Sequence, residues 1–131
     1  MIGLDTNVVV RYIMQDDARQ VAKANKLVES LTIEEPGFLS LVSIVELVWV
    51  LGSSYELKRQ QIAQSLDALL RTKELVIDRA ELVGKALRVY GGTSADFADC
   101  LIQITSAGAG CDRTMTFDKG AAQNAGMTLI P

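Results

Sequence analysis

The chain opens with residues 1–14, MIGLDTNVVVRYIM, in which a short apolar run passes directly into a helical pattern. Residues 1–4 are typical of a short strand, and Asp5 follows it at once. Thr6 or Asn7 can cap a helix over residues 8–14, because their side-chain oxygens accept hydrogen bonds from the first helical turn. A strand that leads straight into a helix is the repeating step of α/β proteins.

The same alternation continues to the end of the chain. Further strands are expected at residues 38–39, 75–77 and 113–116, with an edge strand at 128–130. Helices are expected at residues 16–31, from Ser40 or Ser43 to 51, at 58–71, at 79–90 with Gly91 and Gly92 as its end, at 95–107 capped by Ser94, and at 119–125. This order predicts an α/β fold with a central, mainly parallel sheet of four to five short strands flanked by helices. A length of 131 residues fits a single domain over residues 1–131.

The composition is that of a globular protein, with 49% hydrophobic and 22% charged residues. The longest unbroken apolar run, residues 47–51, is far shorter than the roughly 20 residues of a membrane-spanning helix. No signal peptide is visible, so a cytoplasmic protein with no membrane partner is expected. Cys100 and Cys111 fit reduced thiols that act as small buried hydrophobes, with a regulatory disulfide as the alternative.

Histidine is absent, and this excludes whole classes of chemistry. Catalytic sets of the Ser-His-Asp or Cys-His kind and the usual zinc sites both need it. Hydrolysis would therefore depend on carboxylates, hydroxyls, lysines or a hard metal ion held by oxygen.

The net charge of −3 comes from 13 basic and 16 acidic residues. If five acids formed one metal site, the remaining 11 acids would face 13 basic residues, since 16 minus 5 is 11. The rest of the molecule would then be slightly positive, so the charge does not exclude a partner that carries phosphate. Those five acids are Asp5, Glu46, Asp96, Asp99 and Asp118.

Two of these acids, Asp5 and Asp118, follow predicted strands. In parallel α/β sheets, ligands bind beyond the carboxyl ends of the strands, which favours a functional position for both. Asp is also common after strands because it suits turns and caps, so neither position decides the matter alone.

Glu46 lies inside residues 43–51, SIVELVWVL, a helix that is apolar on nearly every side. A buried carboxylate without a partner is very costly, so burial of Glu46 would require a compensating cation. An exposed stripe or a salt bridge to an Arg is the alternative. The same helix suits either the core or a surface that faces a partner.

Asp96 and Asp99 are three residues apart and share one helix face, where they repel each other unless a cation lies nearby. Capping and the helix dipole are the alternative explanation, and they account for Asp96 better than for Asp99. All these candidate ligands are oxygen atoms, which Mg²⁺ and Mn²⁺ prefer. Such an ion can activate water and stabilise the charge that grows on a phosphate.

Four segments, in order along the chain, resemble the motifs of the PIN domain family, and most closely its VapC-type ribonuclease toxins. They are IGLDTN at 2–7, SIVEL at 43–47, ADFADCLI at 95–102 and TMTFD at 114–118. The resemblance implies a three-layer PIN-like fold. It also implies an Mg²⁺- or Mn²⁺-dependent endoribonuclease that hydrolyses phosphodiester bonds of single-stranded or looped RNA, as the toxin of a type II toxin–antitoxin system.

The resemblance also implies roles for individual residues. Asp5, Glu46 and Asp99 would be metal ligands, Asp118 would help to bind a second metal or its waters, and Asp96 would be auxiliary. Supporting roles would fall to Thr6, Asn7 and Thr116. Arg11 would reach RNA phosphate or an antitoxin carboxylate, although an exposed, solvated arginine is the alternative.

The partners implied are RNA and a cognate antitoxin, with a homodimer or a toxin–antitoxin hetero-oligomer as the assembly. The antitoxin would cover a hydrophobic groove and place a charged residue near the acids. Cleavage would leave 5′-phosphate and 3′-hydroxyl ends.

Three other interpretations compete with this one. A phosphatase of the haloacid-dehalogenase type requires a second acid two residues after the one that follows the first strand. This chain has Asn7 at that position after Asp5. A receiver domain requires an adjacent pair of acids in the loop after the first strand. The adjacent acids of this chain, Asp16 and Asp17, lie after the first predicted helix. A catalytically inactive PIN-like domain that only binds its partner stays open.

Overall fold

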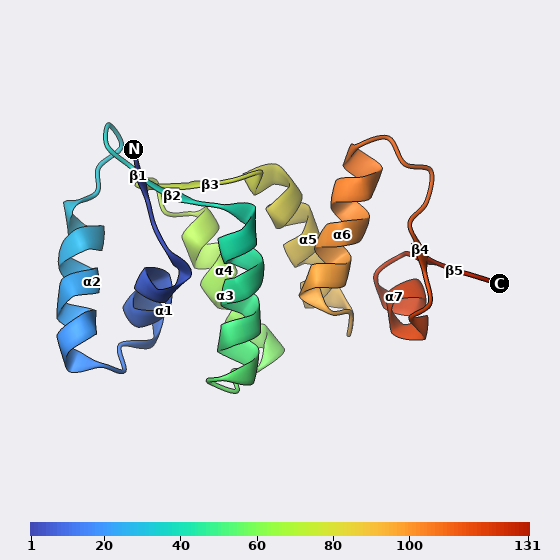
Figure 1. Cartoon of the computed structure of the whole chain (residues 1–131), viewed down its shortest axis with the longest axis horizontal. Helices are drawn as coiled ribbons and strands as arrows, with labels where there is room; N and C mark the ends of the chain where they lie inside the picture. Colours follow the sequence, from blue (N-terminus) through green and yellow to red (C-terminus); the bar gives the residue numbers. More distant parts are fainter. The chain divides into compact units, whose positions relative to one another are not determined.

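The computed structural model describes residues 1–131, and its internal contacts divide the chain into two compact units. The first is Met1–Asp78 and the second is Arg79–Pro131. Figure 1 shows the elements of each unit in sequence colours, from blue to green in the first and from yellow to red in the second. A single domain over residues 1–131 stays a prediction.

The first unit contains three strands and four helices. They are β1 (Ile2–Gly3), α1 (Thr6–Met14), α2 (Ala18–Ser30), β2 (Gly37–Leu39), α3 (Leu41–Ser53), α4 (Arg59–Leu70) and β3 (Leu75–Ile77). The strands form one parallel sheet in the order β1-β2-β3, in which Gly3 pairs with Phe38 and Phe38 with Val76. Each strand reaches the next through a pair of helices, as parallel strands require a long crossover.

The core of this unit begins on one face of the sheet. Leu4, Leu39 and Ile77 lie at the carboxyl ends of the three strands and are all buried. The connection from β1 to β2 and the connection from β2 to β3 both lead to the next strand on the same side. Because such connections are right-handed, the helices of both lie on one face of the sheet. Helix α3 adds Ile44, Leu47 and Leu51 to the core, none of them more than 1% exposed.

The side chains of three leucines lie close to Gly37 at the start of β2. A Cβ atom there would lie 2.9 Å from Cδ1 of both Leu4 and Leu31, and 3.1 Å from Cδ2 of Leu75. Real Cβ atoms hardly ever come within 3.0 Å of another heavy atom, so a side chain at position 37 would require the ends of Leu4 and Leu31 to move.

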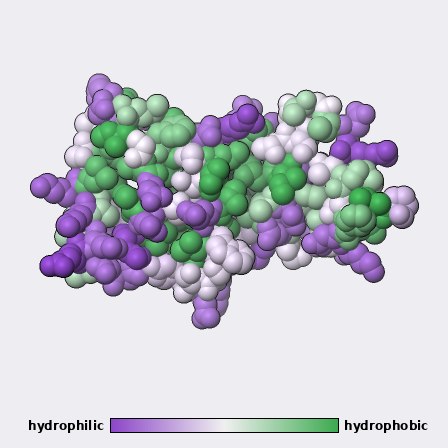
Figure 2. Space-filling view, viewed as in Figure 1, coloured by the Kyte–Doolittle hydropathy of each residue, from purple (hydrophilic) through white to green (hydrophobic).

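The second unit contains three helices and two strands. They are α5 (Ala80–Gly92), α6 (Phe97–Gly108), β4 (Met115–Thr116), α7 (Lys119–Asn124) and β5 (Thr128–Leu129). Helices α5 and α6 pack together, and the rings of Tyr90 and Phe97 meet edge to face with centroids 5.6 Å apart. Strands β4 and β5 form a two-stranded parallel sheet. Met115 in β4 and Leu129 in β5 are exposed. Figure 2 shows that hydrophobic residues reach the surface on this face of the molecule.

The prediction of an α/β fold with parallel strands is confirmed. All five strands pair in parallel, but they form sheets of three and two strands, not one sheet of four to five. Strand β4 has only two residues, and it pairs with β5, which follows it across the short crossover through α7.

Several predicted helix ends are wrong by a few residues. Helix α1 begins at Thr6 with Asp5 as its cap, where Thr6 or Asn7 was expected to cap it. Helix α6 begins at Phe97 with Asp96 as its cap, not Ser94. Helix α5 continues through both glycines to Gly92, because its packing against α6 offsets the roughly 1 kcal/mol cost of each glycine in a helix.

Two other expectations concern the cysteines and the membrane. Neither cysteine forms a disulfide; Cys100 is buried, as expected, whereas Cys111 is exposed. None of the helices combines the length and the apolar character that crossing a bilayer would require.

Candidate functional site

Three of the five candidate acids are the N-caps of helices. Oδ1 of Asp5 accepts a hydrogen bond of 2.8 Å from the N–H of Thr6 at the start of α1. Oδ1 of Asp96 accepts one of 2.7 Å from Ala98, and Oδ1 of Asp118 accepts one of 2.7 Å from Gly120. Each contact satisfies a backbone donor that the helix itself cannot pair. In each case Oδ1 is the atom that makes the cap.

Thr6, expected to support the site, is buried directly beside Asp5. The residue is 3% exposed, and its Oγ1 has no hydrogen-bond partner in the chain. A buried hydroxyl without a partner costs about 1–3 kcal/mol. A polar group kept at that cost next to a candidate ligand is the kind of exception that functional sites carry.

Glu46 is exposed, so the expectation that it is buried within an apolar helix is wrong. Helix α3 packs only one face into the core, and the stripe at positions 42, 46 and 49 faces outward. Val42 and Trp49 on this stripe are 77% and 70% exposed. The helix therefore serves the core on one side and presents an apolar surface with one carboxylate on the other. The cost of burial no longer argues for a cation at Glu46, which stays a candidate ligand only through the resemblance of its segment, residues 43–47.

Asp99 is only partly exposed, and three effects act on it within the second unit. Burial raises the pKa of its carboxyl, and the nearby carboxylates of Asp96 and Asp118 raise it further. Asp99 lies in the first turn of α6, where the helix dipole favours a negative charge. The pKa nevertheless shifts upward, so desolvation and like-charge repulsion outweigh the dipole. The structure thus brings three of the candidate acids into electrostatic contact.

Thr116 fixes the position of Asp118. Its Oγ1 accepts a hydrogen bond of 3.0 Å from the N–H of Asp118, at the point where β4 gives way to α7. Asp118 then caps α7 through Gly120 and Ala121. The orientation of this carboxylate is therefore set by the backbone on both sides.

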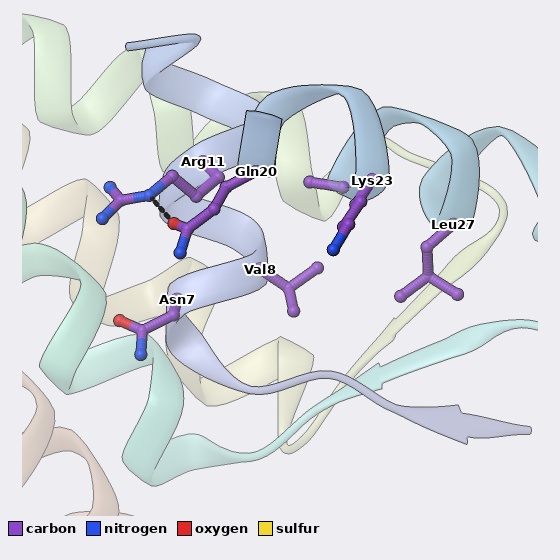
Figure 3. Close-up of a pocket in the computed structure, with 7 residues that line it drawn as sticks. Asn7, Val8, Arg11, Gln20, Lys23 and Leu27 are labelled. Atoms are coloured by element: carbon purple, nitrogen blue, oxygen red, sulfur yellow. Dashed lines mark hydrogen bonds between the residues drawn. The ribbon is translucent and has the colours of Figure 1, made fainter. Parts of the chain in front are cut away.

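Asn7 and Arg11 lie together along a groove between α1 and α2, with a volume of about 270 Å³. Val8, Ala24 and Leu27 give the groove its apolar part. Figure 3 shows Asn7, Val8 and Arg11 reaching it from α1, and Gln20, Lys23 and Leu27 from α2.

Arg11 is not the free, solvated arginine of the alternative interpretation. Its Nη1 donates a hydrogen bond of 2.7 Å to Oη of Tyr55, and its Nε donates one to Gln20, drawn in Figure 3. The same Nη1 lies 3.5 Å from Oδ1 of Asp16. These contacts hold the guanidinium at one end of the groove.

Two features of the first unit were not anticipated from the sequence. Asp78 ends β3 at the same sheet edge as Asp5, and its Oδ2 accepts a hydrogen bond of 3.2 Å from the N–H of Leu41. Asp78 could have been found by the same pattern as Asp5, because each is an acid that follows a predicted strand. The contact of Tyr55 with Asp16 joins residues 39 apart and had no local signal.

The oxygen atoms of the candidate acids suit a divalent cation, although they form no closed cage. No group of three or more Asp, Glu or Cys side chains converges to hold a metal ion. Mg²⁺ does not need such a cage, because it usually binds through one or two carboxylates, keeps several waters and adds substrate phosphates. The crowding of Asp96 and Asp118 around Asp99 in the second unit fits such an ion.

The chain belongs to the PIN domain family, whose model matches residues 2–127. It is similar to a VapC ribonuclease of Aquifex aeolicus (strain VF5), with 22% identity over 117 residues. The similar region covers 88% of this chain and 86% of that protein. The resemblance drawn from four short segments is thus confirmed for the family. Membership decides against the phosphatase and receiver-domain interpretations.

Proposed function

We propose that this protein is a nuclease that hydrolyses RNA phosphodiester bonds with Mg²⁺ or Mn²⁺. The proposed ligands are Asp5, Glu46, Asp99 and Asp118, with Asp96 as an auxiliary acid. The observation that carries the proposal is the position of Asp99 in the second unit, partly buried and close to Asp96 and Asp118, where burial first and then the two neighbouring charges raise the pKa of its carboxyl. A stable fold gains nothing from such repulsion, whereas a bound cation would relieve it. Membership of the PIN domain family and similarity to a VapC ribonuclease support the same conclusion.

The chain's own residues supply position and charge. A divalent ion at these carboxylates would lower the pKa of water and stabilise the charge that develops on the phosphate. Asp5 and Asp118 are held by helix starts, so their free oxygens are oriented before any ligand arrives. Thr116 fixes the backbone at Asp118, and the buried hydroxyl of Thr6 lies ready for a partner beside Asp5. No side-chain nucleophile is required, which agrees with the absence of histidine.

Arg11 is proposed as a phosphate contact at the groove between α1 and α2. Tyr55 and Gln20 hold its guanidinium in place, so less side-chain entropy is lost when an anion binds. Asn7 lines the same groove two residues after Asp5, where it could orient that carboxylate or the substrate.

We further propose that the protein is the toxin of a type II toxin–antitoxin system, works in the cytoplasm and forms a homodimer or a hetero-oligomer with its antitoxin. The apolar groove between α1 and α2 offers the antitoxin a surface that includes Asn7. The VapC name of the similar Aquifex protein supports this role. Co-expression with the product of a neighbouring small gene, followed by isolation of a stable complex that lacks ribonuclease activity, would test it.

The central test is metal-dependent cleavage of single-stranded RNA. Cleavage should stop in EDTA and return with Mg²⁺ or Mn²⁺. Asp5→Asn and Asp99→Asn should each lower kcat by at least about 100-fold, as expected when a group that stabilises transition-state charge is lost. Asp17→Asn is a matched control, because Asp17 also caps a helix but is not a proposed ligand. Cleavage that persists in EDTA, or full activity in either variant, would refute the site.

A binding module without catalysis is the second candidate. The observation in its favour is that no three acids converge on one point. It predicts that the unaltered protein binds RNA equally well with and without EDTA and leaves it intact. Metal-dependent cleavage excludes this candidate.

A further inference from the structure

Arg11 is held in place by residues that lie outside its own helix. Its Nη1 donates a hydrogen bond of 2.7 Å to Oη of Tyr55, in the connection between α3 and α4. Its Nε donates one to Oε1 of Gln20 on α2, drawn as a dashed line in Figure 3. The side chain of Arg11 is 27% exposed. Two of its three nitrogens are thus engaged, and the guanidinium keeps little of the freedom of a solvated arginine.

The contact between Arg11 and Tyr55 can run in one direction only. An arginine has no acceptor, so the phenol oxygen must accept from it. The phenol proton then needs an acceptor of its own, and Oδ2 of Asp16 accepts it at 2.6 Å. The pKa of Asp16 is lowered, chiefly by this hydrogen bond, so its carboxylate is ionised and has no proton to donate. Asp16 thus fixes the side of the phenol oxygen that faces Arg11.

Arg11 shares helix α1 with the proposed ligand Asp5. Asp5 caps α1, and Asn7 and Arg11 are four residues apart on it, so they share a face. Figure 3 shows their two side chains pointing to the same side of the helix. Six residues of α-helix advance about 9 Å, so a phosphate at Arg11 would be a neighbour of the one near Asp5. A contact there serves binding of the substrate and not the chemical step.

The lining of the groove between α1 and α2 favours a polyanion as the ligand of Arg11. The groove has two cations, Arg11 from α1 and Lys23 from α2, and no acid among its lining residues. A single RNA strand carries a charge at every phosphate, so it can meet both cations whatever its sequence. A protein would need an acidic side chain at each of the two places. The substrate of the proposed function therefore matches the groove.

We propose that Asp16 promotes the binding of RNA although its own charge opposes it. Through Tyr55, it holds Arg11 in the orientation that contacts a phosphate next to the one that is cleaved. Asp16 and Tyr55 are positioning residues and need not touch RNA themselves. The inference rests on the proposed ribonuclease function, in which Arg11 is a phosphate contact. A guanidinium that is oriented in advance loses less entropy on binding, and water and salt screen the charge of Asp16, whose side chain is 37% exposed.

The sign of the effect of Asp16 separates positioning from charge. A plain charge effect predicts that loss of the carboxylate lowers KM for RNA, because one repulsive charge is removed. Positioning predicts that Asp16→Ala raises KM by about 2- to 10-fold, the loss of one ordinary hydrogen bond, with kcat nearly unchanged. Asp16→Asn should restore KM to within about 2-fold of the parent value, because an amide oxygen can still accept the phenol proton. Glu29→Ala, which removes an exposed acid at the far end of α2, is the matched control. A KM of Asp16→Ala at or below that of the unaltered protein would overturn the proposal.

A double-mutant cycle tests whether Tyr55 acts through Arg11. Tyr55→Phe should raise KM by about 2- to 10-fold, and Arg11→Gln by about 10- to 100-fold, because hydrogen bonds to charged groups are the stronger kind. In the Arg11→Gln background, Tyr55→Phe should leave KM unchanged. Tyr12→Phe is the control, since Tyr12 is 40% exposed on α1. An equal effect of Tyr55→Phe in both backgrounds would mean that the phenol only supports the fold, and the role of Tyr55 would be refuted.

The possible failures are distinguishable. All measurements use the full-length protein with Mg²⁺ and an unstructured oligoribonucleotide, below the measured Tm of each variant. If the unaltered protein cleaves RNA in a metal-dependent way while Arg11→Gln and Asp16→Ala keep its KM, only this inference falls. If Arg11→Gln leaves KM unchanged but weakens the complex with the antitoxin, Arg11 belongs to a protein interface and the inference is wrong. If the unaltered protein neither binds nor cleaves RNA, both proposals fall.

Discussion

The phenol of Tyr55 donates a hydrogen bond of 2.6 Å to Oδ2 of Asp16, and its oxygen accepts one of 2.7 Å from Arg11. Asp16 lies between α1 and α2, and Tyr55 lies between α3 and α4, so this contact links two connections far apart in the sequence. The hydrogen bond from Tyr55 is the main cause that lowers the pKa of Asp16.

Tyr55→Phe should therefore raise the pKa of Asp16 toward its ordinary value. A carboxyl whose folded pKa is lowered stabilises the fold above its unfolded pKa and loses that contribution as the pH falls through the folded pKa. The variant should be less stable than the unaltered protein at pH 7, and the difference should shrink as the pH falls below about 3.9, the ordinary pKa of an aspartate. Carboxyl carbon NMR titration and urea unfolding at a series of pH values measure this, with Tyr12→Phe as the control. Equal Asp16 pKa values in variant and parent would contradict it.

Gly37→Ala should destabilise the first unit by about 1–3 kcal/mol, the usual cost of overpacking. Its new Cβ would meet Leu4 and Leu31 at 2.9 Å, so at least one leucine must move. Gly3→Ala is the matched control in the neighbouring strand, where nothing lies within 4 Å of the added carbon. Chemical denaturation compares the two. A Gly37→Ala protein as stable as the Gly3→Ala protein would show that the leucines yield freely.

Asp99→Asn should stabilise the protein in EDTA while it abolishes activity. A carboxyl with a raised folded pKa destabilises the fold once it is ionised, so stability falls as the pH rises through that pKa. The variant should gain on the order of 0.5 kcal/mol at pH 7, comparable to one exposed charge interaction, and nothing below about pH 4. Thermal unfolding in EDTA measures the gain, and Asp112→Asn controls for loss of an exposed acid in the same unit.

Addition of Mg²⁺ extends the Asp99→Asn experiment. An ion that binds only the folded protein raises its stability by mass action. Mg²⁺ should raise the Tm of the unaltered protein and have a much smaller effect on the variant. A Tm of the variant below that of the parent in EDTA would mean that Asp99 stabilises the fold and is not strained by its neighbours.

Thr6→Val should stabilise the protein by about 1 kcal/mol and lower its activity. The substitution removes a buried hydroxyl that has no partner in the chain and keeps nearly the same shape. Thr105→Val is the control with the opposite expected sign, because Oγ1 of Thr105 donates a hydrogen bond of 2.7 Å to the carbonyl of Leu101. Urea unfolding and RNA cleavage give the two readouts. Loss of stability in Thr6→Val would show that its hydroxyl has a partner in solution.

The parts of the fold that depend on local pattern were predictable from the sequence. Strand β3 lies where it was expected, because residues 75–77 are a short apolar run between two amphipathic helices. The choice between neighbouring capping residues was not predictable. Asp5 and Thr6 can both cap a helix, and the backbone of Asp5 becomes extended only because β1 and the burial of Thr6 fix where the strand ends.

The candidate acids were found by residue type, and their environments were not. Glu46 lies in an apolar segment, but the core takes up only the face of Ile44 and Leu47, which leaves its carboxylate in water. Hydrophobic content along a helix does not reveal which face a partner element covers. The hydrogen bonds of Tyr55 with Arg11 and Asp16 could not be predicted from the sequence for a similar reason. They depend on two connecting segments that meet only in the folded chain.

The double duty of Asp5, Asp96 and Asp118 as candidate ligands and helix caps bears on how such a chain could evolve. A mutation to Asn, Ser or Thr keeps an acceptor for the helix start, whereas a mutation to Ala costs about 1 kcal/mol at each cap. A lineage released from selection for its chemistry would therefore drift first toward Asn or Ser at these positions. A related sequence with Asn at positions 5 and 118 would therefore be expected to fold well and to lack catalytic activity.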